Sequence, residues 1–380
     1  MNNIKNKTIA IVGGGPGGLT LARLLQIKGA NVVVYERDTD RNARPQGATL
    51  DLHKESGLKA IRDAGLIEAF MANYRPGADR LRIMDQNANI ISDDHTFESD
   101  ETFRPEIDRG PLQNLLLDSL QPGTVVWDSK LISLTPQGDL WRLYFQNGQS
   151  AIAHMVIAAD GANSKIRSYI TPIKPFYSGI TVLEGAVHNS ETASPKIHKL
   201  LNGGKIFALG NEKSLIISSK GDGSLVFYTG CKTSEDWSKE CGINFADKAQ
   251  VLAWFKQEFA GWDPIWLELY KNADAPFVPR PQYCMPLDQT WEAQPNLTML
   301  GDAAHLMPPY AGEGVNMAML DALELSQHLT DNDCPNLHSA IATYEKQMRA
   351  RAAEAAQMTM ESTEALHSPK ALAYLQNVVG

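Results

Sequence analysis

The sequence predicts an α/β fold in which a parallel β-sheet domain is interrupted by an antiparallel β-sheet and followed by a C-terminal helix. The chain opens with an apolar strand at residues 8–12, a glycine-rich turn, a helix at 16–28 and a second strand at 31–36. Between residues 171 and 277 the composition shifts towards Gly, Ser, Thr and aromatic residues, and short apolar runs alternate with turn residues. Helical periodicity then returns after residue 312.

The length of the chain favours more than one domain. Its 380 residues exceed the size at which a single hydrophobic core usually stops growing. We expect residues 1–170 and 278–330 to form one discontinuous domain that carries the parallel sheet. Residues 171–277 are expected to form a substrate-binding domain inserted into it. Residues 331–380 are expected to form a helical segment that packs across both.

Composition excludes several classes of function. The chain has 35 basic and 44 acidic residues, a net charge of −9, and lacks the Lys/Arg runs that nucleic acid or anionic lipid would attract. No stretch approaches the roughly 18 apolar residues of a membrane span, and the N-terminus lacks the pattern of a signal peptide. The four cysteines are far apart and form no C-x-x-C pair, so neither a metal site nor a disulfide framework is indicated. We expect a cytoplasmic monomer.

The first turn has the pattern of a dinucleotide site. Gly13, Gly15 and Gly18 match G-x-G-x-x-G between the first strand and the first helix. Gly13 permits a tight turn, Gly15 lets a pyrophosphate approach the backbone, and Gly18 permits close helix packing. Glu36 ends the second strand, where a carboxylate can accept hydrogen bonds from a ribose. This pattern predicts a Rossmann-type fold, but an ordinary turn without a nucleotide is the alternative, and the pattern does not separate FAD from NAD.

Two later segments of the sequence distinguish FAD from NAD. A strand ends at Asp160 in DGANSKIR, and another ends at Gly301 and Asp302 in GDAAHLMPPYAGEGVN. With the first turn, they resemble the D-G and G-D motifs of the FAD-dependent aromatic hydroxylases, the class A flavoprotein monooxygenases. The resemblance covers most of the chain. It implies a Rossmann-type FAD-binding domain in which Asp302 binds the FAD ribitol and the segment at Asp160 serves both the flavin and the nicotinamide nucleotide.

The residues themselves agree with this assignment. Asp302 follows a strand and precedes a loop, which places its carboxylate at the edge of the sheet where α/β proteins bind ligands. A helix opens nearby, and its unpaired N–H groups can stabilise an anion such as the reduced flavin. The residues that open this helix are Gly312, Gly314, Val315 and Asn316. The alternative is that these glycines only turn a loop.

Three phrases are more similar to the tetracycline-inactivating branch of this family: YERDTDRNARPQGATLDLHK, EIDRGPLQNLLL and GDAAHLMPPYAGEGVN. For the cofactors, the resemblance implies that the adenosine of FAD contacts Glu36 and Arg37, NADPH contacts Arg44, the flavin contacts Asp51, and the FAD chain contacts Arg109. It also implies that the substrate stacks on a flavin face lined by Pro309, Tyr310 and Gly312. The arginines could instead be ordinary solvated side chains, and Asp51 could cap a helix.

The resemblance implies the reaction. NADPH reduces FAD, the reduced flavin reacts with O2, and a C4a-hydroperoxide delivers one oxygen atom to an electron-rich carbon. We therefore expect no catalytic side chain, because the cofactor carries the chemistry. The expected activity is hydroxylation of a polycyclic or aromatic substrate, most of all a tetracycline-type antibiotic, which would confer resistance. The alternatives are hydroxylation of another aromatic metabolite, flavin-dependent halogenation, and a flavin-containing binding or redox-sensing module with little turnover.

The inserted sheet offers few signals about the substrate. Glu184, Lys205 and Phe207 lie on strand-like segments and are the candidates for substrate contacts, although each could face solvent. His305, in the G-D string, is interpreted as a histidine of the core with hydrogen-bond partners rather than as an acid or base.

Overall fold

The computed structural model describes residues 4–43, 49–94 and 104–379. Its strands are β1 (Thr8–Val12), β2 (Asn31–Tyr35), β3 (Thr49–Asp51), β4 (Leu81–Asp85), β5 (Ile90–Asp93), β6 (Glu106–Asp108), β7 (Val125–Val126), β8 (Leu131–Gln137), β9 (Leu140–Phe145), β10 (Ser150–Ala153), β11 (Met155–Ala158), β12 (Phe176–Val187), β13 (Lys205–Gly210), β14 (Lys213–Ser219), β15 (Leu225–Lys232), β16 (Asp274–Cys284) and β17 (Leu297–Met299). Its helices are α1 (Pro16–Ile27), α2 (Gly57–Asp63), α3 (Ile67–Met71), α4 (Arg109–Asp118), α5 (Arg167–Ile170), α6 (Ser190–Ala193), α7 (Pro195–Leu201), α8 (Trp237–Glu240), α9 (Lys248–Glu258), η2 (Pro264–Trp266), α10 (Leu267–Asn272), α11 (Asp302–His305), η3 (Pro309–Ala311), α12 (Gly314–Thr330), α13 (Leu337–Leu366) and α14 (Ala371–Val379).

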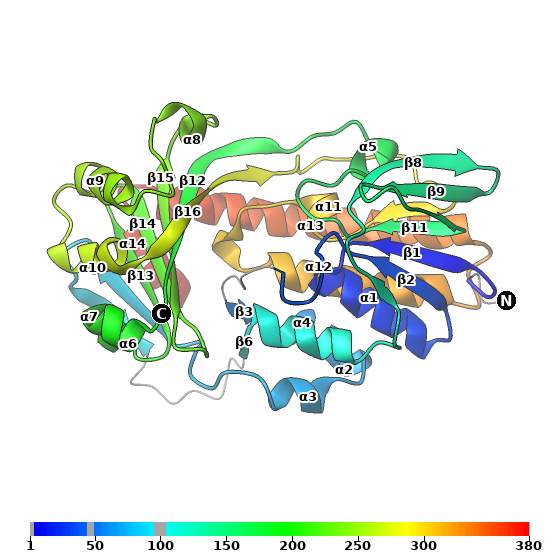
Figure 1. Ribbon diagram of the computed structural model, residues 1–380, viewed down its shortest axis with the longest axis horizontal. Helices are drawn as coiled ribbons and strands as arrows, with labels where there is room; N and C mark the ends of the chain where they lie inside the picture. Colours follow the sequence, from blue (N-terminus) through cyan, green and yellow to red (C-terminus); the bar gives the residue numbers. More distant parts are fainter. Residues whose placement is uncertain (1–3, 44–48, 95–103, 380) are drawn as a thin grey trace.

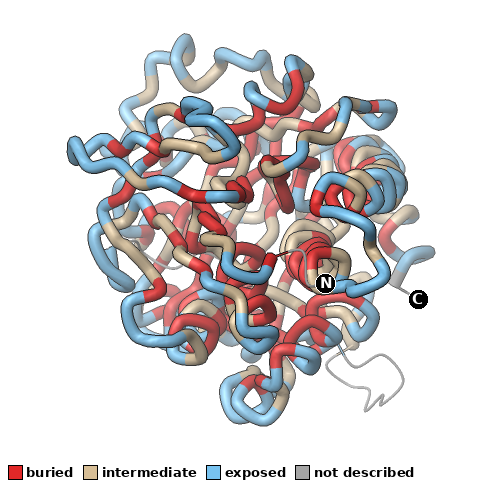
Figure 2. The backbone as a smooth tube through the Cα atoms, turned by 90° about the vertical axis from the view of Figure 1, so that its right-hand side faces the viewer, coloured by how far each residue is buried: buried red, intermediate tan, exposed pale blue. Residues whose placement is uncertain are grey.

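A parallel sheet forms one end of the molecule (Figure 1). Its strand order is β17-β11-β1-β2-β7, so β11 pairs with β1 on one side and with β17 on the other. The central strand β1 is buried along nearly its whole length, as its continuous apolar run requires. Helices α1 and α12 pack on one another beside this sheet. Figure 2 looks onto this end of the molecule and shows buried segments at the centre with exposed segments around them.

The second large sheet has seven strands in the order β16-β12-β15-β14-β13-β4-β5. Its outer side is covered by α9 and α10 and by an aromatic cluster that includes Phe227, Phe255 and Tyr270. Helical periodicity between residues 61 and 120 predicts helices there. The structure has α2, α3 and α4 in or at the edge of this range, but it also places β4 and β5 in this sheet. The reason is long-range pairing: β4 forms a parallel ladder with β13, from Leu81 opposite Lys205 onward. Local periodicity does not reveal such a partner.

Helix α13 joins the two sheets (Figure 1). Its 30 residues span about 45 Å. Near its start, the Tyr344 hydroxyl donates to the Met299 carbonyl at the end of β17, at 3.1 Å. Just beyond its end, His367 lies 3.1 Å from the Ser214 hydroxyl on β14. The last helix, α14, packs on β13 and β4.

The predicted α/β fold class is therefore confirmed, with a parallel sheet, an antiparallel-rich sheet and C-terminal helices. The predicted domain limits stay a prediction, and the seven-stranded sheet draws on residues 81–93 as well as 176–284. Within the described ranges, none of the helices combines the length and apolarity that crossing a bilayer would demand.

Candidate functional site

The carboxyl edge of the parallel sheet gathers four of the predicted residues. Gly13 directly follows β1, Glu36 follows β2, and Asp160 comes shortly after β11. Asp302 comes shortly after β17. Since these four strands are neighbours and run in the same direction, all four residues lie at one edge of the sheet. Ligands of open α/β sheets bind at such an edge.

The glycine turn has one open position between two crowded ones. Gly13 has a φ of +113°, and a Cβ there would lie 2.2 Å from the Ala159 carbonyl oxygen. A Cβ on Gly18 would lie 2.1 Å from the Gly13 carbonyl oxygen. At Gly15, by contrast, a Cβ would meet nothing within 4 Å, and this residue is the N-cap of α1. The open space at a helix N-terminus fits an anionic group such as a pyrophosphate.

Glu36 is buried and holds the turn in place. Its Oε2 accepts the Gly14 backbone N–H at 2.5 Å, and its Oε1 accepts the Asp38 N–H at 3.0 Å. The next residue, Arg37, is exposed. Arg44 lies outside the described residues, so its predicted contact with NADPH stays a prediction.

Arg167 connects the two later motifs, and the sequence reasoning missed it. This buried side chain donates to the carbonyls of Ala162, Asp302 and Ala303 at 3.1, 2.7 and 2.7 Å. It therefore ties the segment after β11 to the segment after β17. The available signal was its position inside the DGANSKIR string.

Asp160 has one carboxylate oxygen without a partner. Its Oδ2 accepts the Lys165 N–H at 2.8 Å. Its Oδ1 is buried and, among the described residues, has no partner in hydrogen-bonding geometry. Buried polar atoms in native proteins are nearly always hydrogen-bonded, so this oxygen indicates a missing donor.

Asp302 starts α11 and lies among positive charges. Burial raises the pKa of its carboxyl, whereas His305, Arg109 and Arg167 act in the opposite direction. Arg109 begins α4 with an exposed side chain, yet its charge reaches Asp302. The structure thus brings Arg109 and Asp302, both predicted to contact FAD, to the same place.

The start of α12 presents backbone donors. Gly312, with a φ of +73°, precedes this helix. Among the described residues, the backbone N–H groups of Gly314, Val315 and Asn316 have no hydrogen-bond partner. Three unpaired donors at the N-terminus of a 17-residue helix can stabilise a negative charge.

The Asn316 side chain, however, makes hydrogen bonds to other residues of the protein. It is fully buried, and its Nδ2 donates to the Asp51 carbonyl at 2.9 Å. Its Oδ1 accepts the N–H groups of His53 and Gly57 at 2.8 and 3.3 Å and the Ser56 hydroxyl at 3.2 Å. A ligand can therefore reach only the backbone N–H of Asn316. Sequence reasoning did not reveal that this side chain clamps residues 51–57.

We expect the substitution Asn316→Ala to lower the free energy of unfolding by about 3 kcal/mol, because it leaves several buried groups without partners. Urea unfolding followed by circular dichroism measures this loss. The control is Asn147→Ala, which removes an exposed asparagine that also makes two hydrogen bonds, and we expect a loss below about 1 kcal/mol. Equal losses in the two variants would contradict the clamp.

Asp51 lies beside the loop before α12. A Cβ on Gly312 would lie 3.4 Å from its Oδ1. Its Oδ2 lies 2.5 Å from Arg104 Nη2 and 3.1 Å from His53 Nε2. Burial alone would raise the pKa of Asp51, but the hydrogen bond from His53 and the charges of Lys205 and Arg104 lower it to about 2. This carboxylate is therefore ionised at neutral pH, and it does not cap a helix.

The three substrate candidates share one face of the seven-stranded sheet. Glu184 lies opposite Tyr228, Tyr228 opposite Ile216, and Ile216 opposite Phe207, so these four form a row across four strands. Lys205 is two residues from Phe207 on the same strand and shares its face.

Two of these candidates form ion pairs. Glu184 pairs with Arg280 on the neighbouring strand β16. Lys205 pairs with Glu106, a buried residue of β6, and so links the seven-stranded sheet to the small sheet that holds Asp51. Burial raises the pKa of Glu106, whereas Lys205 acts to lower it.

Tyr310 contacts the C-terminal end of α13. Its ring meets that of His367 edge-on at 5.1 Å, and its hydroxyl lies 3.4 Å from His367 Nε2. Burial lowers the pKa of His367 to about 4, so this imidazole is neutral at pH 7. His367 also lines a cavity of about 450 Å³ between β12 and α13, together with Ser178 and Met360.

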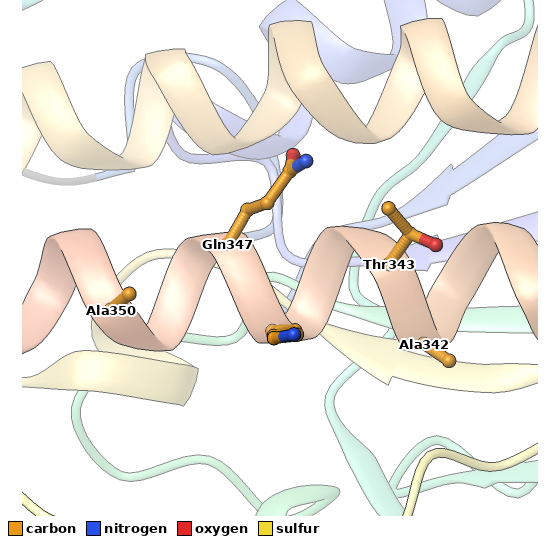
Figure 3. Close-up of a pocket in the computed structure, with 5 residues that line it drawn as sticks. Ala342, Thr343, Gln347 and Ala350 are labelled. Atoms are coloured by element: carbon orange, nitrogen blue, oxygen red, sulfur yellow. The ribbon is translucent and has the colours of Figure 1, made fainter.

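A larger hollow of about 570 Å³ lies along α13, away from these residues (Figure 3). It is lined by Ala342, Thr343, Lys346, Gln347 and Ala350. Its lining holds no acidic side chain and no aromatic ring, and the predicted residues are elsewhere.

Comparisons with known proteins agree with this geometry. Residues 6–239 and 289–359 match the family model described as "FAD binding domain". The monooxygenase asqM of Emericella nidulans is 28% identical, over 96% of this chain and 96% of its own. Among solved structures, Klebsiella pneumoniae HpxO complexed with FAD and uric acid has a TM-score of 0.78 at 20% identity, covering 99% of this chain and 94% of its own. The tetracycline destructase Tet(55) has a TM-score of 0.78 at 19% identity, covering 100% and 96%. Both structures share the fold.

Proposed function

Because the chain belongs to the FAD-binding-domain family of flavin monooxygenases, we propose that it binds FAD at the carboxyl edge of the parallel sheet and hydroxylates a polycyclic or aromatic substrate. The observation that carries this proposal is the set of functional residues at the ends of four neighbouring strands. In the part of the chain that the structure describes, they include an open glycine at a helix N-terminus, a buried carboxylate oxygen without a hydrogen-bond partner, and Asp302, on which the charges of Arg109 and Arg167 act. These are the features that a negatively charged dinucleotide with ribose hydroxyls requires.

The residues fit FAD along its length. Glu36 and Arg37 would lie at its adenosine, Gly15 at its pyrophosphate, and Asp302 with Arg109 at its ribitol. The N–H groups of Gly314 and Val315 would face the flavin ring. We also include Asp160, whose free Oδ1 suits a hydroxyl donor. Bound FAD would supply the activation of O2, and we propose NADPH as its reductant.

The protein itself shapes the space beside the flavin. Pro308 and Pro309 stiffen the loop before α12, and Met307 is buried behind it. Backbone N–H groups at the start of α12 stabilise negative charge without reorganising. The Lys205–Glu106 ion pair links the seven-stranded sheet to β6 beside Asp51.

We propose a tetracycline-type antibiotic as the substrate, with drug resistance as the result. Phe207, Ile216 and Tyr228 form an apolar and aromatic strip across the seven-stranded sheet. The Glu184–Arg280 pair lies at one end of this strip, so an amine and an acidic enol of one ligand would each find a partner. The three phrases resembling the tetracycline-inactivating branch support the same substrate.

Aerobic incubation with NADPH and tetracycline tests the substrate. We expect the drug to gain the mass of one oxygen atom and to lose its absorbance. If uric acid or a simple phenol stimulates NADPH oxidation while tetracycline does not, the substrate assignment is wrong and the monooxygenase assignment stands. If no compound of an aromatic panel stimulates NADPH oxidation, the protein is a flavin-containing binding or redox-sensing module and not an enzyme.

A further inference from the structure

A buried carboxylate lies behind the segment that would hold FAD. Asp321 on α12 has a side chain with no exposed surface. It accepts hydrogen bonds from His305 Nε2 at 2.5 Å, from Arg351 Nη2 at 2.8 Å and from the Gly301 N–H at 3.0 Å. One carboxylate therefore connects α11, α12 and α13. The mechanism above makes no use of it.

The charges in this network are balanced. Arg351 on α13 pairs with Asp321 and also with Glu324, at 2.6 Å from its Oε2. His305 is only 2% exposed, so a positive charge on its ring needs a counter-ion. Burial alone would lower the pKa of His305, but Asp321 outweighs burial and raises it. The pKa of Asp321 is lowered in spite of its burial, chiefly by His305 and Arg351.

This network borders Asp302. His305 ends the one-turn helix that Asp302 begins, and the Gly301 amide precedes Asp302 directly. The positive charges of three groups act to lower the pKa of the Asp302 carboxyl: His305 from the same helix, Arg109 from α4 and Arg167 from α5. The arginines are charged at every physiological pH. Arg167 also faces Asp160, whereas His305 needs Asp321 to remain charged.

We propose that His305 is a positioning residue held as an imidazolium by Asp321, whose carboxylate Arg351 also binds, and that its charge favours the ionised form of Asp302 while Asp321 fixes the Gly301–Asp302 turn. The proposal rests on the proposed function in one respect, that Asp302 binds FAD. Asp321, His305 and Asp302 then form a buried carboxylate–imidazolium–carboxylate chain, and only Asp302 would contact the cofactor. No proton is transferred during turnover.

Two NMR titrations of the full chain test the proposal, and each is done with and without FAD. The ¹⁵N shifts of labelled histidine report the charge of His305, and the ¹³C shift of labelled aspartate reports the ionisation of Asp302. We expect the titration midpoint of His305 to lie above that of an exposed histidine, because its Nε2 donates to the Asp321 carboxylate. In His305→Gln, which retains a donor to Asp321, we expect the Asp302 midpoint to rise by about one pH unit, since one buried cation is lost.

The affinity for FAD gives a second readout. As the pH is lowered, the dissociation constant for FAD should begin to rise at a pH about one unit higher in His305→Gln than in the wild type, as Asp302 takes up a proton. The matched control is His328→Gln on α12, whose imidazole bonds Gln347 at the surface, and its pH profile should equal that of the wild type.

The substitution Asp321→Asn tests whether Asp321 keeps His305 charged. We expect His305 to become neutral at pH 7 in this variant and the FAD profile to follow that of His305→Gln. If Asp321→Asn does not fold, Arg351→Gln removes a cation that competes with His305 for Asp321, so it should raise the His305 midpoint while leaving the Asp321 contact. A neutral His305 in the wild type, or an Asp302 midpoint unchanged in His305→Gln, overturns the proposal. Failure of the wild type to bind FAD overturns the proposed function instead, because both titrations still report on the network.

Discussion

Gly13→Ala is expected to lower the free energy of unfolding by about 4 kcal/mol and to release FAD from the protein. The new Cβ would lie 2.2 Å from the Ala159 carbonyl oxygen and 3.0 Å from the Asp160 Cα, and both are backbone atoms. The φ of +113° adds strain that a side chain cannot relieve. The end of β11 must move, and it carries Asp160 with it. Thermal unfolding and flavin absorbance of the purified protein measure the two losses.

Gly29→Ala separates crowding from backbone strain. Gly29 also has a positive φ, of +76°, but a Cβ there meets nothing within 4 Å. We expect this variant to lose only about 1 kcal/mol and to retain FAD. Similar losses at Gly13 and Gly29 would show that strain alone accounts for the first result, and the close approach of β1 to the end of β11 would then be unimportant.

Gly15→Val is expected to raise the dissociation constant for FAD about 100-fold or more while changing the free energy of unfolding by less than about 1 kcal/mol. Gly15 has a φ of −77° and a ψ of 176°, which valine adopts readily, and a Cβ there would meet no atom of the described residues within 4 Å. The added methyl groups would occupy the place that we assign to the pyrophosphate.

The series Gly15→Ala and Gly15→Val makes this result quantitative. The affinity should fall with each added carbon while the unfolding midpoint stays constant, as measured by flavin fluorescence quenching and by urea unfolding. Unchanged affinity in Gly15→Val would place the cofactor elsewhere. A large loss of stability would mean that the open space serves the fold and not a ligand.

The local features of the site could be predicted from the sequence. Gly13, Gly15 and Gly18 have the glycine spacing of a dinucleotide-binding turn, and Glu36 and Asp302 each follow an apolar strand. Such features depend on neighbours within a few residues. The parallel sheet could be anticipated for the same reason, because its strands are continuous apolar runs.

Long-range partners could not be predicted in this way. The strand β4 pairs with β13, more than 100 residues later, and Arg167 bonds carbonyls at Asp302 and Ala303. Asp321 gave only a weak signal, because it is one of two acidic residues in a largely apolar helix. Its partners are set by how α12 packs against α11 and α13, which no local pattern records. The substrate contacts depend on the seven-stranded sheet, whose two faces differ mainly through packing.

Isotope labelling tests the central claim most directly. The protein reconstituted with FAD is supplied with NADPH and ¹⁸O2, and the product formed from a tetracycline or from a stimulating aromatic compound is analysed by mass spectrometry. We expect the product to carry one ¹⁸O atom for each NADPH consumed in productive turnover. A product without ¹⁸O, or NADPH oxidation that no aromatic compound accelerates, would show that the protein is not a monooxygenase of aromatic substrates.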